Sequence, residues 1–487
     1  MIKIIGLGPG APEALTVGAI EALKSIHKVY LRTEKHPTVQ YIQSLGIKFE
    51  TYDRAYDNFE TFDEVYSFIA EDLINKHEKE GDLIYAVPGH PLVAEKSVRL
   101  LVEQCKEKNI EFEVISAVSF VDVVMERLQI DPIEGLKIVD AFECKNHIFD
   151  KRIGTIITQV YDQYIASEVK LALSAYYRDD TQVYFVRAAG IKGQESIRPM
   201  ALYEIDRQTD IDYLTSIYIP KDLDNHKDFY DLVDIMERLR GDNGCPWDKE
   251  QTHESLKRYL VEECYEVLEA IDQEDEDKIT EELGDVLLQV VFHSVIAEEE
   301  GYFTIRDVIE GICNKMIQRH PHVFGDTTAE DSKQVLKNWE EIKKAEQGTK
   351  TLTEEMQHIA KNLPALMRAE KVQNKARKVG FDWDRVEDAL DKVLEEFKEL
   401  KEVYNGESKA RILEEMGDLL FSVVNVSRFL QVNPEEALNN TTNKFIERFK
   451  FIEEVALKKG LKLESMTLEQ MDNLWNEAKK LKSKKKL

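Results

Sequence analysis

Carboxylate side chains recur at fixed spacing in the second half of the chain. Glu263 and Glu266 lie three residues apart, and Glu282 and Asp285 follow with the same spacing. Side chains three or four residues apart share one face of a helix, so each pair is expected to project together. The same four residue types return 133 residues further along, again with 19 residues from the first pair to the second. The second set consists of Glu396, Glu399, Glu415 and Asp418.

Two such pairs on neighbouring helices would bring four carboxylates to one level of a helical bundle. Like charges about 4 Å apart repel by ~4 kcal/mol at an effective dielectric constant of about 20, so a cation is expected between them. Mg²⁺ is the expected ion, because it prefers oxygen ligands and keeps open positions for water and substrate phosphate. A solvated acidic helix face is the alternative for a single run, but it has no reason to repeat its register. A second alternative is that the site was duplicated and that one of the two copies has since lost its function.

Basic and aromatic residues follow both acidic sets and are repeated as well. Lys444 and Arg448 stand four residues apart, and so do Trp475 and Lys479. Lys and Arg on one face, near an acidic metal site, suit a substrate with several phosphates, since Arg gives bidentate contacts and Lys a point charge. Ordinary surface charge around a buried tryptophan is the competing interpretation. The first copy carries Lys315, Arg319, Trp339 and Lys343 in the same pattern.

The chain changes its pattern near residue 220. Before this point short β-rich runs alternate with helical runs, which is typical of an α/β domain. After Ile219 and Pro220 the apolar residues follow helical spacing. We therefore predict an α/β domain over 1–220 and two all-α modules over 221–348 and 349–487. The predicted strands are 3–7, 28–32, 82–87, 112–115, 155–159, 182–187 and 214–219.

Composition limits the classes of function that the chain can have. Its 487 residues include 93 acidic and 65 basic side chains, which give a net charge of −28. This balance argues against binding a nucleic-acid polymer or an anionic membrane, because both need a basic surface. No signal peptide or membrane-spanning run is recognisable, so we expect a cytoplasmic protein. The five cysteines are scattered and predict neither a disulfide framework nor a zinc site.

The helical half resembles the MazG family of nucleoside triphosphate pyrophosphohydrolases. The family pattern is EE-x-x-E followed by E-x-x-D, and it is present in both copies. The resemblance extends to GCPWDKEQTH, HPHVFGD, NK-x-x-x-R and W-x-E-x-KK, over residues 225–482. It implies an all-α, Mg²⁺-dependent enzyme that cleaves between the α- and β-phosphates and releases pyrophosphate. It also implies a homodimer formed through the helical modules.

The resemblance also implies roles for individual residues. The two carboxylate sets would hold the metal, and the C-terminal copy is the favoured working site, although the first copy keeps its carboxylates too. Glu395 or Glu414 is the candidate for orienting the attacking water. The groups expected at the substrate phosphates are Lys444, Arg448, Trp475 and Lys479, of which the three cations would offset charge on the leaving pyrophosphate.

The N-terminal half resembles the tetrapyrrole methylases, which bind S-adenosylmethionine in a cleft between two α/β subdomains. The resemblance covers residues 1 to 220 and falls on loops at strand ends, where open α/β sheets place their ligands. It implies a cofactor site made by several of these loops. His90 stands where these methylases usually carry Asp. The matching residues are Gly6, Gly8, Gly10, Pro88, Gly89, His90, Ser116, Ser119, Thr158, Arg187 and Ala188.

The glycine loop GLGPGA has two other interpretations. It can be scored as the dinucleotide fingerprint G-x-G-x-x-A, but Pro9 removes a backbone donor and Thr16 indicates that the helix starts several residues late. A tight turn after a strand is the other interpretation.

A nucleotide-pool pyrophosphohydrolase with Mg²⁺ as cofactor is thus the main expectation, and S-adenosylmethionine is the cofactor implied for the first domain. The alternative is a methyltransferase whose helical half serves assembly or regulation. A regulatory or vestigial methylase domain also remains open.

Overall fold

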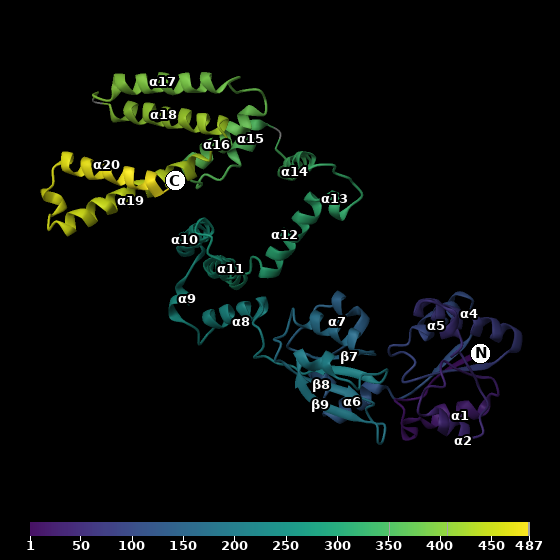
Figure 1. The fold of residues 1–487 in the computed structure, drawn as a ribbon. Coiled ribbons are helices and arrows are strands. Elements are labelled where there is room, and N and C mark those ends of the chain that lie inside the picture. The colour runs from purple at the N-terminus through teal and green to yellow at the C-terminus, as the bar shows by residue number, and fades with distance from the viewer. Residues whose placement is uncertain (350, 407, 486–487) are drawn as a thin grey trace. The chain divides into compact units, whose positions relative to one another are not determined.

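The first half of the chain folds into two subdomains, each built on a five-stranded sheet (Figure 1). The computed structural model describes residues 1–349, 351–406 and 408–485. The strands of the first subdomain are β1 (Ile2–Gly6), β2 (Val29–Leu31), β3 (Glu50–Thr51), β4 (Leu83–Val87) and β5 (Phe112–Ile115). They run parallel in the order β3-β2-β4-β1-β5. Parallel sheets have both faces covered, and every residue of the central strand β4 is accordingly buried.

Helices cover both faces of this first sheet. They are α1 (Val17–Ser25), α2 (Val39–Ser44), α3 (Ala55–Asn58), α4 (Phe62–Glu80) and α5 (Lys96–Glu107). Ile4 of β1 packs with Leu73 and Leu101 of α4 and α5, whereas Ile5 packs with Leu23 of α1. Successive side chains of β1 therefore supply the two opposite layers of the core.

The second subdomain contains a mixed sheet in the order β6-β7-β10-β8-β9. Its strands are β6 (Leu136–Asp140), β7 (Gly154–Thr158), β8 (Gln182–Arg187), β9 (Ser196–Ala201) and β10 (Thr215–Ile219). Only β6 and β7 pair in parallel; the other pairings are antiparallel. Helix α6 (Phe120–Leu128) contributes Val124 to the layer that holds Ile156, and α7 (Gln163–Leu173) contributes Val169 to the layer that holds Ile157.

The rest of the chain is helical and belongs to two compact units, Met1–Tyr302 and Phe303–Leu487. The first unit adds α8 (Phe229–Arg240), α9 (Pro246–Glu250), α10 (His253–Asp272) and α11 (Glu276–Glu299) to the two subdomains. The second unit begins with α12 (Ile305–Arg319), α13 (Pro321–Phe324), α14 (Ser332–Gln347), α15 (Leu352–Gln357) and α16 (Ala365–Arg377). It ends with α17 (Val386–Val403), α18 (Lys409–Phe429), α19 (Pro434–Lys458) and α20 (Leu468–Lys485).

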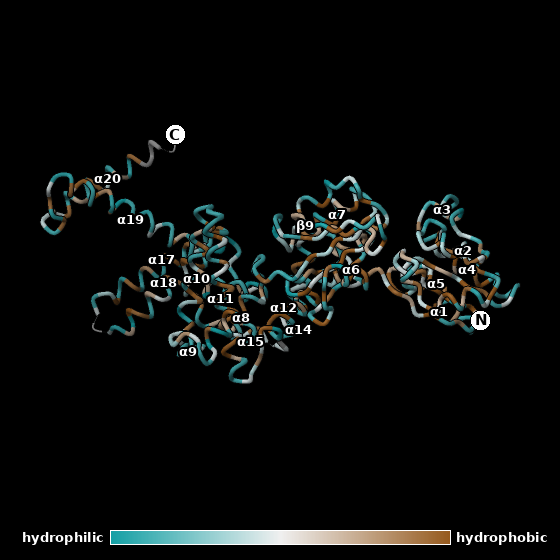
Figure 2. The backbone as a smooth tube through the Cα atoms, turned by 90° about the horizontal axis from the view of Figure 1, so that it is seen from below, coloured by the Kyte–Doolittle hydropathy of each residue, from teal (hydrophilic) through white to brown (hydrophobic). Residues whose placement is uncertain are grey.

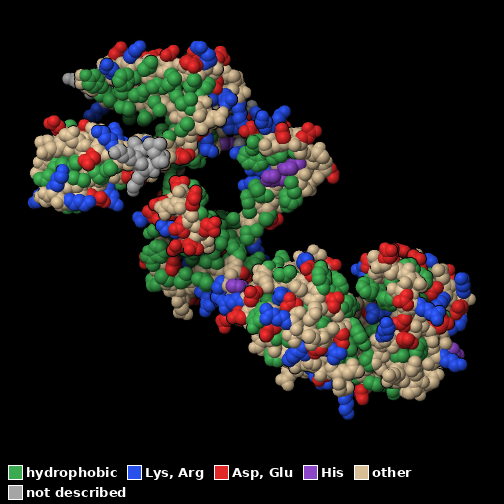
Figure 3. Space-filling view, viewed as in Figure 1, with side chains coloured by type: hydrophobic (Ala, Val, Ile, Leu, Met, Phe, Trp, Pro, Cys, Tyr) green, Lys and Arg blue, Asp and Glu red, His purple; other side chains and the backbone are tan. Residues whose placement is uncertain are grey.

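Three helical hairpins dominate this half: α10 with α11, α17 with α18, and α19 with α20. Hydrophobic and hydrophilic segments alternate along these helices (Figure 2), as amphipathic packing requires. In the second unit a broad hydrophobic surface lies over α17 and α18 (Figure 3), where Leu394, Phe397 and Leu420 are about half exposed. Among the described residues, no helix is long and apolar enough to cross a membrane.

The α/β half followed by helices agrees with the sequence prediction, and each of the seven predicted strands is present. Three further strands were not predicted: β3, β6 and β9. The boundary between the compact units falls at residue 302, inside the predicted module 221–348. The domain bounds 1–220, 221–348 and 349–487 therefore stay predictions.

Candidate metal centres and ligand cleft

The first carboxylate set gathers where α10 packs against α11. Glu263 and Glu266 from α10 and Glu282 from α11 offer ligand oxygens that all lie within 4.8 Å of one another. Burial, together with the charges of Asp285 and Glu266, raises the pKa of Glu263. Burial and the charge of Glu266 also raise the pKa of Glu282. The predicted convergence of Glu263, Glu266 and Glu282 is present, and Asp285 lies within electrostatic range of them.

The second carboxylate set gathers in the same way between α17 and α18. Oxygens of Glu396, Glu415 and Asp418 lie within 4.8 Å of one another. Glu396 is only 6% exposed, so its charge is largely removed from water. Glu399 is exposed and lies outside this trio, but partial desolvation by its neighbours and the charges of Glu396 and Glu415 raise its pKa.

The predicted phosphate-binding residues lie on α19 and α20. The Arg448 guanidinium stacks 5.2 Å from the centre of the Trp475 ring, which also contacts Phe445. Lys444 is exposed one turn before Arg448, and Lys479 follows Trp475 by one turn. Within the described residues, no ion pair joins Lys444 or Arg448 to the carboxylates of α17 and α18. In the first copy Arg319 instead pairs with Glu346.

A cleft of about 990 Å³ is lined by residues of both α/β subdomains. Five of the predicted cofactor residues line it: Gly8, Pro88, Gly89, Thr158 and Ala188. The backbone around the cleft is strained, because Ala94, Gln159 and Ala188 all line it with φ between 52° and 62°. Such strain in residues other than glycine is typical of ligand-binding sites.

The other predicted cofactor residues hold the loops in place. A Cβ atom on Gly6 would lie 2.3 Å from the carbonyl oxygen of Gly89, so only glycine lets these two loops meet. Ser119 caps α6, and the Arg187 Nε donates to Asp212 at 2.9 Å. The Nδ1 of His90 accepts from the backbone N–H of Leu92 at 3.1 Å. The remaining members of this set are Gly10, packed against Ile191, and Ser116, whose carbonyl accepts from Thr16.

Comparison with known proteins finds a matching family for each half of the chain. The MazG nucleotide pyrophosphohydrolase domain matches residues 251–324 and 385–452. The chain is 53% identical over 251 residues to the nucleoside triphosphate pyrophosphohydrolase/pyrophosphatase MazG of Thermotoga maritima, covering 95% of that protein and 52% of this chain. It is 44% identical over 254 residues to the nucleoside triphosphate pyrophosphohydrolase of Escherichia coli (strain K12), covering 96% of that protein and 51% of this chain.

The chain belongs to the MazG family. Ahead of its two MazG segments it carries a tetrapyrrole (corrin/porphyrin) methylase domain, which matches residues 1–206. The chain is also similar to the uncharacterized protein YabN of Bacillus subtilis (strain 168). The two are 47% identical over 482 residues, and the match covers 98% of each chain.

A lysine contacts the second carboxylate set of this MazG chain. The Nζ of Lys392 lies 2.7 Å from Glu396 and 3.0 Å from Glu395. The 133-residue repeat places Tyr259 at the matching position of the first set. Sequence reasoning missed Lys392, although aligning the two copies would have revealed the difference in charge.

A second feature that sequence reasoning missed lies in the cleft of the methylase domain. Arg32 and Glu95 form an ion pair there, with 3.1 Å between the guanidinium and the carboxylate, and the Glu95 side chain is only 5% exposed. Burial raises the pKa of Glu95 to about 7, although Arg32 opposes this shift. Arg32 is the last residue of the predicted strand 28–32 and directly follows β2, and the rule that ligands bind at strand ends was the available signal.

Proposed function

We propose that the helical half is a Mg²⁺-dependent pyrophosphohydrolase that converts a nucleoside triphosphate and water into a nucleoside monophosphate and pyrophosphate. The observation that carries this proposal is the pair of three-carboxylate clusters, each formed by three of the four carboxylates in its copy of the repeat. Both relatives named above as nucleoside triphosphate pyrophosphohydrolases support it.

The donor set fits a hard divalent cation. Three oxygens within 4.8 Å of one another match the ligand chemistry of Mg²⁺. Desolvation, followed by the charges of the neighbouring carboxylates, raises the pKa values of Glu263, Glu282 and Glu399. When bound, Mg²⁺ polarises phosphate oxygens and lowers the pKa of water. The proposed ligands are Glu263, Glu266, Glu282 and Asp285 in the first copy, and Glu396, Glu399, Glu415 and Asp418 in the second.

The remaining proposed roles belong to side chains around the second cluster. Glu395 or Glu414 orients the attacking water, and both are exposed on the helices that carry the cluster. Lys444, Arg448 and Lys479 neutralise charge on the leaving pyrophosphate, and Trp475 supports Arg448 through their ring contact. This role requires α19 and α20 to bring these cations to the substrate.

A hydrolysis panel of four ribonucleotides and four deoxyribonucleotides tests the proposal. We expect release of pyrophosphate and monophosphate that needs Mg²⁺ and stops in EDTA. Glu263→Gln combined with Glu396→Gln should lower kcat by about 100-fold or more, because a metal site contributes several kcal/mol to the transition state. The single variants show which copy is active.

A matched control lies on the same helix as Glu396. Glu387 is exposed in the first turn of α17, nine residues before Glu396 and hence on the opposite face. Glu387→Gln should leave the activity unchanged. Activity that persists in EDTA or in the double variant would rule out the proposal and favour a helical half that serves assembly only.

For the methylase domain we propose S-adenosylmethionine as the cofactor, bound in the cleft lined by Gly8, Gly89 and Ala188. Positive φ at these positions and the buried, unpartnered Nδ1 of His36 in the same cleft support a bound ligand. Isothermal titration with S-adenosylmethionine checks this proposal. Binding should be unaffected by Glu263→Gln and Glu396→Gln, which lie outside the cleft.

A further inference from the structure

Aromatic rings from both subdomains line the cleft of the methylase domain. The first subdomain contributes Tyr56, Phe62 and Tyr66, whose ring centres lie 6.2 to 6.4 Å apart. The second contributes Phe142 and Tyr161, with ring centres 6.0 Å apart. Ring faces and edges on both walls favour a flat aromatic ligand between them.

The charged residues of the cleft are mainly acidic. Two basic residues, Arg32 and Lys35, line it together with four acidic ones. His36 adds no positive charge near neutral pH, because burial and the charge of Arg32 lower its pKa to about 4. The acidic residues are Asp53, Asp57, Glu95 and Asp162.

The more buried of the two cations is already paired. Arg32 contacts Glu95 at 3.1 Å, and its side chain is 20% exposed, whereas Lys35 is exposed at the rim. Only the Nε of Arg32 and the Nδ1 of His36 are buried without a partner among the cleft-lining groups of the described chain. A ligand therefore meets at most one or two polar groups that seek a partner, and no surplus of positive charge.

Tetrapyrrole substrates carry several carboxylates, which need a basic pocket to offset their desolvation and mutual repulsion. We propose that this cleft, beside the S-adenosylmethionine proposed above, binds a second compound that is planar, aromatic and neutral or cationic, and that it excludes polycarboxylate macrocycles. The inference concerns the methylase domain and does not depend on the pyrophosphohydrolase activity proposed for the helical half.

Size-matched acridines separate charge from shape as the cause of binding. Isothermal titration of the full chain at moderate salt would use N-methylacridinium as the cation, acridone as the neutral ring, acridine-9-carboxylate as the anion and uroporphyrin III as the polycarboxylate. We expect the cation and the neutral ring to bind at least tenfold more tightly than the anion, and uroporphyrin III not to bind. Failure of both the cation and the neutral ring to bind, or binding of uroporphyrin III, would overturn the proposal.

Variants test whether the acridines bind in the cleft. Asp57 is exposed, so Asp57→Lys is compatible with folding. This variant should bind N-methylacridinium more weakly and acridine-9-carboxylate more tightly than the wild type. Glu71→Lys changes the net charge equally on an exposed site of α4 that does not line the cleft, and it should have no effect. Tyr66→Ala should lower the affinity for N-methylacridinium about fivefold, as expected for loss of one ring contact, and Tyr66→Phe should retain the affinity. Equal effects of Asp57→Lys and Glu71→Lys would show non-specific attraction and contradict the proposal.

Discussion

A lysine contacts the second carboxylate cluster and has no counterpart at the first. Lys392 reaches forward along α17 to Glu395 and Glu396, while Tyr259 occupies the matching position on α10. These carboxylates raise the pKa of Lys392, so it remains positively charged at physiological pH. A divalent ion in the second cluster must displace this lysine or share the carboxylates with it, and the first cluster imposes no such competition.

Removing the lysine should therefore strengthen metal binding in the second copy. In a Glu263→Gln background, we expect Lys392→Met to bind Mn²⁺ or Mg²⁺ about tenfold more tightly, since one nearby charge contributes about 1 to 4 kcal/mol. Isothermal titration of metal measures this directly. The mirror variant, Tyr259→Lys in a Glu396→Gln background, should weaken the first site.

Lys398→Met provides the control, because Lys398 is exposed on α17 two residues after Glu396. Unchanged or weaker metal binding in Lys392→Met would show that the lysine assists the metal site instead of competing with it.

The sequence allowed functional residues to be predicted where their pattern occurs twice along the chain. It did not reveal functional residues that come together only when the chain folds. Glu263 and Glu396 were found because one register occurs twice. Arg32 and Glu95 are 63 positions apart and come from different elements, so no local spacing relates them. The aromatic walls were missed for the same reason.

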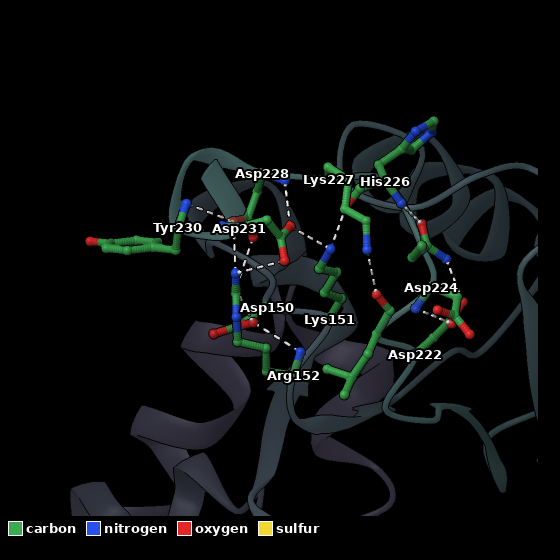
Figure 4. Close-up of polar contacts among 12 residues, drawn as sticks. Asp150, Lys151, Arg152, Asp222, Asp224, His226, Lys227, Asp228, Tyr230 and Asp231 are labelled. Carbon is green, nitrogen blue, oxygen red and sulfur yellow. Dashed lines mark hydrogen bonds and ion pairs between the residues drawn. The ribbon is translucent and has the colours of Figure 1, made fainter. Parts of the chain in front are cut away.

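At the level of elements, α8 is fixed to the second subdomain by charged contacts (Figure 4). Lys151 Nζ donates to Asp231 at 2.6 Å and to the carbonyl of His226 at 2.8 Å, and its side chain is only 4% exposed. Arg152 binds both oxygens of Asp228, the N-cap of α8, at 2.7 and 2.8 Å. Acidic residues at a helix N-terminus also match the helix dipole.

Loss of the buried lysine should loosen this junction. Lys151→Met removes the nearer cation of Asp231 and leaves it a longer contact to Arg152 at 3.7 Å. The cost should therefore stay below the roughly 3 kcal/mol of a fully broken buried ion pair. Native-state hydrogen exchange of the α8 amides measures the effect. Lys227→Met is the control, because Lys227 is exposed and its Nζ donates to the carbonyl of Leu223 in the same loop. Equal protection in both variants would argue against a structural role for Lys151.

Acid should weaken the Arg152 contact. Hydrogen bonding from Arg152 lowers the pKa of Asp228 from 3.8 to about 2. Because the folded-state pKa is depressed, this group stabilises the fold above about pH 4, and the contribution disappears as the pH falls toward 2. The difference in α8 stability between wild type and Arg152→Gln should thus shrink over that range. A difference that stays constant with pH would contradict the assignment.

The three strands that the sequence did not predict all lie at the edges of their sheets. β9 is an edge strand that contains Pro199, and proline is tolerated there because an edge strand has backbone N–H groups that need no partner in the sheet. β3 has only two residues and β6 lies at the other edge of its sheet. Central strands such as β4 gave a clear signal because both of their faces are buried.

At the scale of the whole molecule, the exposed hydrophobic surface of α17 and α18 is unusual for a chain that functions alone. Leu394, Phe397 and Leu420 are 58%, 49% and 50% exposed. Patches of this kind mark association surfaces. The homodimer implied by the MazG resemblance provides an occupant, namely the same helices of a second copy.

Charge placed on this surface should dissociate the dimer. We expect wild type to elute with the mass of two chains in light-scattering chromatography, and Phe397→Lys with Leu420→Lys to shift the equilibrium to monomer by at least tenfold. Leu171→Lys, at a 61% exposed site on α7, should leave the dimer intact. A monomeric wild type, or a dimer that resists the double variant, would refute this assembly.

The contact between Gly6 and Gly89 affects how a library of random substitutions would be interpreted. Position 6 should tolerate no replacement, because any side chain forces β1 away from the neighbouring loop, whether or not a methyl donor is ever bound. Intolerance at Gly6 is therefore a measure of folding. Positions such as Asp57, which lies in an ordinary helical turn and has an exposed side chain, are the ones whose tolerance reports on the ligand.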